Sequence, residues 1–332
     1  MQGFWQNRRV LVTGAGGFIG SHVTEALVHL GARPRAMVHY NSRSDWGHLE
    51  ALDNAVYQKI EIVPGDVRDP FFVQSAVKDQ TVVLHLAALI AIPYSYVAPA
   101  DYVATNIAGT LNVLQACRDH GVEKLVHTST SETYGTAEYV PIDEKHPLKG
   151  QSPYSASKIG ADKMAESYYR SFNTPVATLR PFNTFGPRQS ARAVIPSIIS
   201  QIASGAHELH LGSLTPVRDL TFVSDTVRAF LAVAESPKTV GEVLNAGNGK
   251  GIAVGELVEM ICEMMGARIK VTLDEQRVRP ANSEVMRLVC NAEKLQNLTG
   301  WRPQHDLRSG LGRTIDYIEA HLAHYKHEIY SV

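Results

Sequence analysis

The sequence contains no apolar run as long as the roughly 18 residues that a membrane-spanning helix requires. Its first residues, MQGFWQNRRVLVTG, lead into a predicted strand and lack the apolar segment of a signal peptide. Only three cysteines occur in 332 residues, and the wide spacing of Cys117, Cys262 and Cys290 excludes a disulfide framework. We therefore expect a cytoplasmic protein with buried thiols and no membrane partner.

The chain also lacks an excess of charge of either sign. Its 32 basic and 33 acidic residues give a formal net charge of -1, and they are spread along the whole sequence. Because nucleic acids and anionic membranes bind clustered positive charge, this distribution argues against both and favours a small-molecule ligand. The 14 histidines show no metal-ligand spacing, so we expect no metal site.

Short apolar runs alternate with helical patterns in the first half of the chain. The run from Asp101 to His120 is predicted to be one helix, with Val103, Ile107, Leu111 and Leu114 on one face. Strands of continuous apolar residues that alternate with helices indicate an α/β fold, in which a doubly wound parallel sheet is covered on both faces. The strand candidates are RRVLVTG, RPRAMVHY, IEIVPGD, TVVLHLAA, KLVHTST and PVATLRP.

After Pro181 the elements become shorter and are punctuated by glycine, proline and arginine. We predict a dinucleotide-binding Rossmann domain at residues 1–180. Residues 181–332 are predicted to form mainly a smaller substrate-binding α/β region, with some segments returning to the first domain. The helices expected in this second part span residues 193–204, 224–234 and 307 to about 324, and a strand is expected at LHLG.

The segment VLVTGAGGFIG places Gly14, Gly17 and Gly20 between the first strand and the first helix. Glycines at such a turn allow positive φ and close approach of a pyrophosphate to main-chain N–H groups, and the helix N-terminus adds partial positive charge. The strand-turn-helix setting therefore predicts dinucleotide binding, with Phe18 and Ile19 among the contacts.

Later strand ends add to the predicted cofactor site. Asp66, followed by Val67 in PGDVRD, is a candidate acceptor for an adenine amine. Leu86, Ala87 and Ala88 offer small or apolar side chains beside a bound cofactor.

One feature typical of an NAD site is missing. An acidic residue normally follows the glycines by about 20 residues and binds the adenosine ribose, but here the second strand ends in VHYNSRSD, with His39 near that place. Arg43 can pair with the 2'-phosphate of NADP, whereas Asn41 and Ser42 can bond a plain ribose. We favour NAD and keep NADP as the alternative.

The segment SPYSASKIGADKMAESYYRSF predicts a helix that begins with Tyr154 and Lys158, which are four residues apart and share one face. A nearby ammonium group stabilises a phenolate. Tyr154 can then remove a proton from a sugar or alcohol hydroxyl while a hydride leaves the same carbon. We expect both residues to contact the cofactor as well.

The sequence resembles the extended short-chain dehydrogenases/reductases, the family of nucleotide-sugar epimerases and dehydratases, over essentially its whole length. In that family a hydroxyl at the position of Thr130 completes the triad with Tyr154 and Lys158. The resemblance also implies that Asn106 contacts the cofactor, and that Asn183, Arg218 and Arg279 face the substrate diphosphate. Its motifs are TGAGGFIGSH, GDVRD, HLAA, TNIAGTLNVL, RPFNTFGPR, RDLTFVSD and the late GW-P segment.

The stretch HTSTSETYGT distinguishes branches of this family. Epimerases that oxidise and reduce only C4 usually carry small neutral residues at the position of Glu132, whereas dehydratases need a carboxylate to remove the C5 proton. TSETYG resembles the TSELYG of GDP-mannose 4,6-dehydratases. It departs from the TDEVYG of dTDP-glucose 4,6-dehydratases, because Ser131 replaces the aspartate that assists loss of the C6 hydroxyl. Either Glu132 performs both proton transfers or Ser131 relays one of them.

Other segments resemble the 4,6-dehydratases that begin legionaminic acid synthesis: LIAIPYSYVAP, YVPIDEKHPLKGQSPYSASK and PFNTFGPRQSARAVIP. This resemblance implies a UDP- or GDP-linked N-acetylglucosamine substrate and a 4-keto-6-deoxy product, with Ser95, Arg188 and Arg192 near the sugar nucleotide. Nucleotide-glucuronate decarboxylases share the T-S-E run and, with C4 epimerases, remain alternatives. A non-enzymatic dinucleotide sensor would not need the intact triad.

Family members commonly form homodimers. The resemblance implies a four-helix bundle between two copies, to which each copy contributes the helix from Asp101 and the helix from Pro153.

Overall fold

The computed structural model describes residues 2–325, and its centre is a seven-stranded sheet of order β11-β6-β5-β4-β1-β2-β3. Every neighbouring pair in this sheet is parallel. All six strands predicted in the first half are present. The strands are β1 (Arg9–Thr13), β2 (Arg33–His39), β3 (Glu61–Gly65), β4 (Val82–His85), β5 (Lys124–Thr128), β6 (Val176–Pro181) and β11 (Val243–Ala246).

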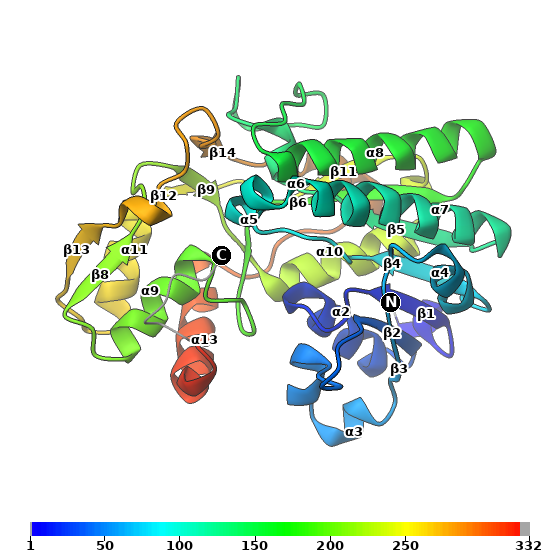
Figure 1. Cartoon of the computed structure of the whole chain (residues 1–332), viewed down its shortest axis with the longest axis horizontal. Coiled ribbons are helices and arrows are strands. Elements are labelled where there is room, and N and C mark those ends of the chain that lie inside the picture. Colours follow the sequence, from blue (N-terminus) through cyan, green and yellow to red (C-terminus); the bar gives the residue numbers. More distant parts are fainter. Residues whose placement is uncertain (1, 326–332) are drawn as a thin grey trace.

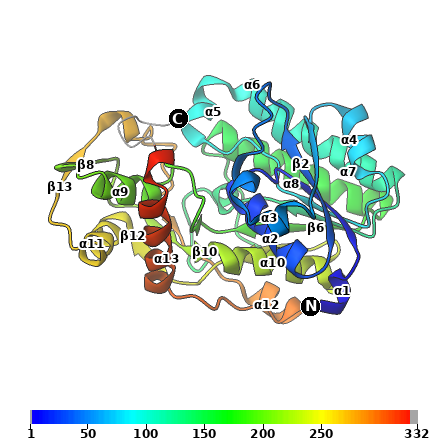
Figure 2. The ribbon, with the colours of Figure 1, turned by 90° about the horizontal axis from the view of Figure 1, so that it is seen from below.

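Helices cover both faces of the sheet, as Figures 1 and 2 show. Helix α7 (Gly109–Asp119) packs between α4 (Pro70–Val77) and α8 (Pro153–Phe172), and on the opposite face α2 (Phe18–His29) packs against α10 (Val223–Glu235). Alternate side chains of β1 enter different cores. Leu11 joins the residues beneath α7, whereas Val10 and Val12 join those beneath α2 and α10. The predicted doubly wound α/β fold is confirmed.

Shorter elements connect the sheet to these helices. They are α1 (Gln2–Trp5), η1 (Gly47–Ala51), α3 (Asn54–Tyr57), α5 (Ile92–Val97), α6 (Pro99–Tyr102), η2 (Val103–Ala108), η3 (Ser131–Tyr134) and η4 (Pro237–Thr239). Strand order reverses between β1 and β4, so the carboxyl ends of these strands flank the crevice in which α/β proteins bind ligands.

The chain beyond β6 forms a smaller region at the left of Figure 1, with sheets β12-β9-β14, β13-β8 and β10-β7. Yet α10 and β11, which also lie beyond residue 180, belong to the large sheet and its cover. The domain division stays a prediction. The remaining elements are β7 (Thr184–Phe185), α9 (Val194–Ala203), β8 (Glu208–Leu211), β9 (Val217–Asp219), β10 (Thr221–Phe222), β12 (Gly251–Ala253), α11 (Val254–Met264), β13 (Lys270–Leu273), η5 (Glu275–Arg277), β14 (Arg287–Leu288), α12 (Glu293–Thr299), α13 (Leu307–Ala320) and η6 (Leu322–His324).

Two helices differ from their predicted form. The predicted single helix at residues 101–120 is interrupted by a π-helical turn at Val103–Ala108, where the Asn106 side chain bonds the main chain of Leu89. The four residues predicted on one face also differ in burial, since Val103 and Leu111 are 54% and 36% exposed whereas Leu114 is fully buried. The last helix ends at Ala320 rather than near residue 324, and a short 3-10 turn follows.

Within residues 2–325, no helix is long and apolar enough to cross a membrane. The same residues contain no cluster of three or more histidine, cysteine or acidic side chains that could hold a metal ion. The three cysteines are free, and Cys117 and Cys290 are buried.

Candidate active site

The glycine turn lies at the carboxyl end of β1, beneath the crevice. Gly14 has a φ of 70°, and a Cβ there would lie 2.8 Å from the main-chain nitrogen of Ala87. A Cβ on Gly20 would lie 2.2 Å from the Gly14 carbonyl oxygen. Helix α2 begins at Phe18 after Gly17, and no side chain caps its first turn. The geometry fits a pyrophosphate at this helix N-terminus, with Ile19 in the same turn.

The loop after β2 uses one predicted ribose contact for its own structure. The Asn41 side chain accepts hydrogen bonds from the main-chain N–H groups of Arg43 and Asp45, at 3.1 Å each, and donates to the Asp45 carbonyl at 2.7 Å. That Asn41 also bonds the ribose stays a prediction. His39 is exposed and lies 3.7 Å from the Asp66 carboxylate, and Arg43 is exposed.

The other predicted cofactor contacts surround the ends of β3 and β4. The Asp66 carboxylate is bonded by Arg68, whose guanidinium lowers the pKa of Asp66. Val67 is buried beside Gly109. Thr13 accepts hydrogen bonds from the N–H groups of Leu86 and Ala87, which fixes the segment that continues to Ala88. Fully buried Asn106 bonds both the Leu89 main chain and the Ser157 hydroxyl.

The stretch HTSTSETYGT forms the end of β5 and the 3-10 turn η3. Thr130 begins this turn, and its hydroxyl oxygen accepts a hydrogen bond from the Glu132 N–H at 3.2 Å. Ser131 and Glu132 are only 2% and 8% exposed. The turn therefore places a carboxylate in a buried position two residues after the triad hydroxyl.

Tyr154 and Lys158 lie in the first turns of α8, and their surroundings differ from the expected phenolate-ammonium pair. Burial raises the pKa of Tyr154, and the charge of Glu132 adds to this, whereas a hydrogen bond with Thr130 acts in the opposite direction. Lys158 donates to the Thr128 carbonyl oxygen at 2.6 Å, and burial lowers its pKa to about 8. In this structure the Tyr154 phenol is therefore protonated.

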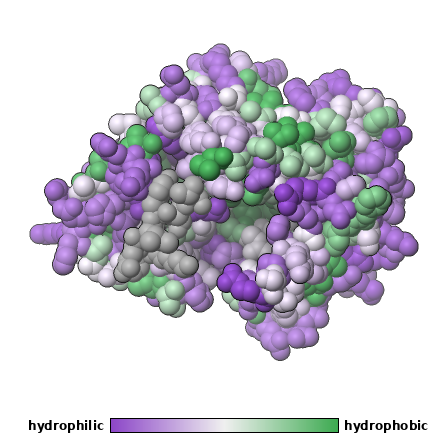
Figure 3. All heavy atoms as spheres, in the orientation of Figure 1, coloured by the Kyte–Doolittle hydropathy of each residue, from purple (hydrophilic) through white to green (hydrophobic). Residues whose placement is uncertain are grey.

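A cavity of about 320 Å³ lies between the large sheet and the smaller region. Figure 3 shows the surface hollowed between these two parts, with apolar residues on the floor. Four of the predicted substrate contacts line the cavity: Asn183, Arg192, Arg218 and Arg279. The side-chain Oδ1 of Asn183 is buried and has no hydrogen-bond partner in the part of the chain that the structure describes.

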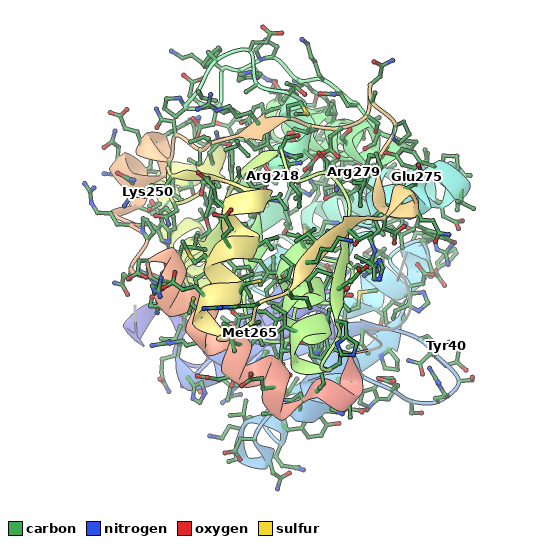
Figure 4. The ribbon with its side chains drawn as sticks, turned by 90° about the vertical axis from the view of Figure 1, so that its left-hand side faces the viewer. Tyr40, Arg218, Lys250, Met265, Glu275 and Arg279 are labelled. Carbon is green, nitrogen blue, oxygen red and sulfur yellow. The ribbon has the colours of Figure 1, made fainter. Side chains whose placement is uncertain are left out.

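Arg218 and Arg279 converge in this cavity, and Figure 4 shows their side chains close together. A third side chain, Glu284, joins them. One of its carboxylate oxygens lies 3.1 Å from Arg218 and 3.6 Å from Arg279. Burial lowers the pKa of Arg218, and the negative charges of Glu132 and Glu284 oppose this shift. The charge of Glu132 on η3 therefore acts on Arg218 in the cavity.

Two predicted substrate residues lie elsewhere. Arg188 forms an ion pair of 2.7 Å with Glu25 and a hydrogen bond with Ser21, both on α2. Ser95 is fully buried and donates to the Ile92 carbonyl oxygen at 2.7 Å. Arg188 joins the loop after β7 to α2, and Ser95 closes the turn of α5. That they contact the substrate stays a prediction.

Sequence reasoning missed two charged residues of the cavity, Arg277 and Glu284. Arg277 donates to Asp274 at 2.9 Å and to the Ser197 hydroxyl at 3.2 Å. The run RVRP contained a signal, since Arg277 and Arg279 alternate like residues that face one side of an extended segment. Glu284 had no comparable signal, because its partner Arg218 lies 66 residues away.

Comparison with known proteins identifies relatives over nearly the full chain. The family model described as GDP-mannose 4,6 dehydratase matches residues 11–314. The Homo sapiens protein named dTDP-D-glucose 4,6-dehydratase is 31% identical over 330 residues, which cover 96% of this chain and 92% of that protein.

Two solved structures share the fold at similar identity. The dTDP-glucose 4,6-dehydratase DesIV from Streptomyces venezuelae, with NAD bound, has a TM-score of 0.84 and 27% identity, and covers 96% of this chain and 99% of its own. The UDP-N-acetylglucosamine 4-epimerase from Methanobrevibacter ruminantium, in complex with UDP-N-acetylmuramic acid, has a TM-score of 0.85 and 29% identity, and covers 95% and 99%. The fold and the family match agree. The chain belongs to the GDP-mannose 4,6-dehydratase family, within the extended short-chain dehydrogenases/reductases.

Proposed function

We propose that this protein is an NAD-dependent 4,6-dehydratase that converts a UDP- or GDP-linked N-acetylglucosamine to its 4-keto-6-deoxy derivative. The observation that carries the proposal is the buried carboxylate of Glu132, two residues after Thr130 and close enough to Tyr154 to raise the pKa of its phenol. An enzyme that acts at both C4 and C5 needs a base for each, here the Tyr154 phenol for C4 and the Glu132 carboxylate for C5.

The first step is oxidation at C4. Tyr154 accepts the C4 hydroxyl proton as hydride leaves C4, and Thr130, bonded to Tyr154, orients that hydroxyl. When bound, NAD supplies the hydride acceptor and a positive charge that favours ionised Tyr154. The uncapped N-terminus of α2, the close turn at Gly14 and Gly20 and the small residues after β4 fit this dinucleotide.

The second step is loss of water across C5 and C6. The new C4 ketone makes the C5 proton acidic, Glu132 removes it, and the C6 hydroxyl departs with a proton as water. A bound reduced cofactor would then supply the hydride that adds to C6 while a proton adds to C5, which would regenerate the oxidised cofactor. Ser131, buried beside Glu132, either relays the proton to the departing C6 oxygen or leaves both transfers to Glu132.

The proposed substrate matches the charge of the cavity. Arg218 and Arg279 provide charge-assisted donors for a diphosphate. Asn183 has a buried oxygen without a hydrogen-bond partner among residues 2–325, which suits a substrate N–H or hydroxyl donor. The sequence resemblance to legionaminic acid 4,6-dehydratases and the structural likeness to a UDP-N-acetylglucosamine 4-epimerase support the N-acetylglucosamine moiety.

The competing functions are C4 epimerisation and decarboxylation of a nucleotide-linked glucuronate. The likeness to a 4-epimerase favours the first, and the T-S-E run permits the second. Glu132 favours dehydration over epimerisation, because a C4 epimerase needs no C5 base. The segments LIAIPYSYVAP, YVPIDEKHPLKGQSPYSASK and PFNTFGPRQSARAVIP, which resemble 4,6-dehydratases, favour dehydration over decarboxylation.

We further propose a cytoplasmic homodimer formed through α7 and α8. These helices pack against each other, and exposed Val103 and Leu111 give the preceding turn and α7 an apolar outer surface. Contact with the same pair of helices in a second copy would make a four-helix bundle.

The test is incubation with UDP- and GDP-N-acetylglucosamine, each with NAD and with NADP, followed by mass spectrometry of the sugar nucleotide. A product lighter by one water supports the proposal. An unchanged mass with inverted C4 identifies an epimerase, and loss of carbon dioxide from a nucleotide-glucuronate identifies a decarboxylase. No water loss from any common nucleotide-hexose would refute the dehydratase assignment.

A further inference from the structure

A row of polar side chains is buried near the carboxyl edge of the sheet. Thr13 on β1 pairs in register with His85 on β4, His85 pairs with His127 on β5, and Arg180 on β6 pairs with Asn245 on β11. The Thr13 hydroxyl and His85 Nδ1 are 2.8 Å apart, and the two histidine rings stack with centroids 5.9 Å apart. Central parallel strands are usually apolar on both faces, so this row is an exception that its contacts must explain.

Asp162 on α8 is the anion to which this row connects. It is 4% exposed and accepts hydrogen bonds from His127 Nε2 at 3.1 Å, from the Ser129 hydroxyl at 2.7 Å and from two nitrogens of Arg180 at 2.8 and 3.1 Å. Burial alone would raise the pKa of Asp162, but the bond with His127 and the charge of Arg180 lower it to about 2. The carboxylate is therefore ionised throughout the working pH range.

These contacts join the segments that carry the catalytic groups. His127 and Ser129 flank Thr128, whose carbonyl oxygen accepts the hydrogen bond from Lys158, and Thr130 follows on the same strand end. Lys158 lies one turn before Asp162 on α8.

The network also reaches the turn of Glu132. Arg180 donates to the Tyr134 hydroxyl at 2.9 Å, and Tyr134 donates to Asn245 at 2.8 Å. Tyr134 is the last residue of η3, which contains Glu132. Asp162 and its partners thus link β5, η3 and α8 in one buried unit.

We propose that Asp162 is a positioning residue for C4 oxidation, which holds the strand end of Thr130 against the helix of Tyr154 and Lys158. The inference rests on the proposed function only for this oxidation, a step that dehydratases and epimerases share. Asp162 acts through its neighbours.

The charge of Asp162 acts on both members of the catalytic pair. The titratable and charged groups around Lys158 and Asp162 are His85 on β4, His127 on β5 and Arg180 on β6. Those that act on Tyr154, besides Asp162, are Glu132 on η3 and Tyr102 on α6, and both raise its pKa. The negative charge of Asp162 raises the pKa of both Lys158 and Tyr154. Loss of this charge must lower both pKa values.

The experiment is Asp162→Asn in the full-length protein. We expect kcat to fall about 10- to 100-fold, because the reacting groups lose their fixed separation, while KM stays within about twofold. Both limbs of the pH profile of kcat should move to lower pH, since the pKa values of Tyr154 and Lys158 fall together. A defect in stability alone would lower the amount of active enzyme without moving either limb.

Asp225→Asn is the matched control, since Asp225 is also a buried carboxylate that bonds an arginine and a histidine, Arg228 and His305, outside this network. It should leave the pH profile unchanged. If Asp162→Asn does not fold, Ser129→Ala tests the inference instead, because Ser129 donates a hydrogen bond to Asp162 and carries no charge. We expect a severalfold lower kcat at unchanged KM.

Two results would overturn the inference. One is an Asp162→Asn variant whose kcat and pH profile equal those of the wild type. The other, where that variant does not fold, is a Ser129→Ala variant with the kcat of the wild type. Failure of the proposed function is a separate result, because it would be seen in the wild-type protein as a product that has not lost water. If that product is a C4 epimer, C4 oxidation still occurs and the Asp162 comparison stands.

Discussion

Replacement of Glu132 by glutamine separates the two halves of the proposed reaction. The side chain keeps its size, and the hydrogen bond that it shares with Thr130 uses the main-chain N–H, so η3 should keep its shape. Only the carboxylate is lost. Dehydration requires that carboxylate as a base, whereas C4 oxidation requires Tyr154, Thr130 and Lys158.

The replacement should slow dehydration but not abolish C4 oxidation. Loss of a general base lowers the rate of its step by about 100- to 10,000-fold, which corresponds to about 3 to 5 kcal/mol in the activation free energy. Because the charge of Glu132 raises the pKa of Tyr154, its removal lowers that pKa. Oxidation should therefore persist, and its rise with pH should begin at a lower pH than in the wild type.

Two signals measure these halves in one sample. Absorbance of the reduced nicotinamide reports C4 oxidation, and deuterium exchange at C5 with product mass reports the later step. We expect Glu132→Gln to accumulate reduced cofactor without C5 exchange or water loss. Glu284→Gln is the matched control, since it neutralises another carboxylate close to Arg218 and should change KM without blocking C5 exchange. Wild-type dehydration by Glu132→Gln would refute the assignment of Glu132 as the base.

Three further predictions follow from other parts of the structure. Gly20→Ala should abolish NAD binding in a fluorescence titration, because its Cβ would lie 2.2 Å from the Gly14 carbonyl oxygen; retained affinity would contradict this use of the turn. Arg188→Ala should destabilise the fold by about 1 to 2 kcal/mol in denaturant unfolding, through loss of its pair with Glu25, and leave the substrate KM unchanged; a raised KM would return Arg188 to the substrate site. Burial raises the pKa of Asp219 from 3.8 to about 6, so its contribution to stability is present below pH 3.8 and is lost as pH rises through 6. The fall in Tm between those pH values should therefore be smaller in Asp219→Asn, and an unchanged slope would argue against the raised pKa.

The large sheet could be predicted from sequence because local patterns determine it. Apolar runs such as RRVLVTG and KLVHTST mark β1 and β5, and helical spacing marks α7, even though the π-helical turn before it left no sequence signal. The turn depends on a tertiary contact, the bond between Asn106 and the Leu89 main chain, and local propensity does not contain such contacts.

The candidate site likewise contains residues that local sequence patterns predict and residues that depend on tertiary contacts. Thr130, Glu132, Tyr154 and Lys158 lie on two short segments, and their spacing within each segment carries the chemistry. Glu284 and the ion pair of Arg188 depend on which loops meet after folding, and a single sequence gives no measure of that. Arg188 is an example, since arginines in a loop can face a ligand or a neighbouring helix with the same local sequence.

The buried polar row depends on both the local sequence pattern and tertiary contacts. His85 and His127 lie on central strands, where two apolar faces are the rule, and each buried polar group costs free energy unless it is hydrogen-bonded. The bonds of His85 to Thr13 and Thr110, and of His127 to Asp162, offset that cost. Asp162 also accepts a hydrogen bond from Arg180, so the row connects neighbouring strands at the level of the proposed catalytic groups. An apolar row would hold the strands together but would not fix the end of β5. In this protein, the polar residues of the central strands therefore lie at the edge of the sheet where we propose that the chemistry takes place.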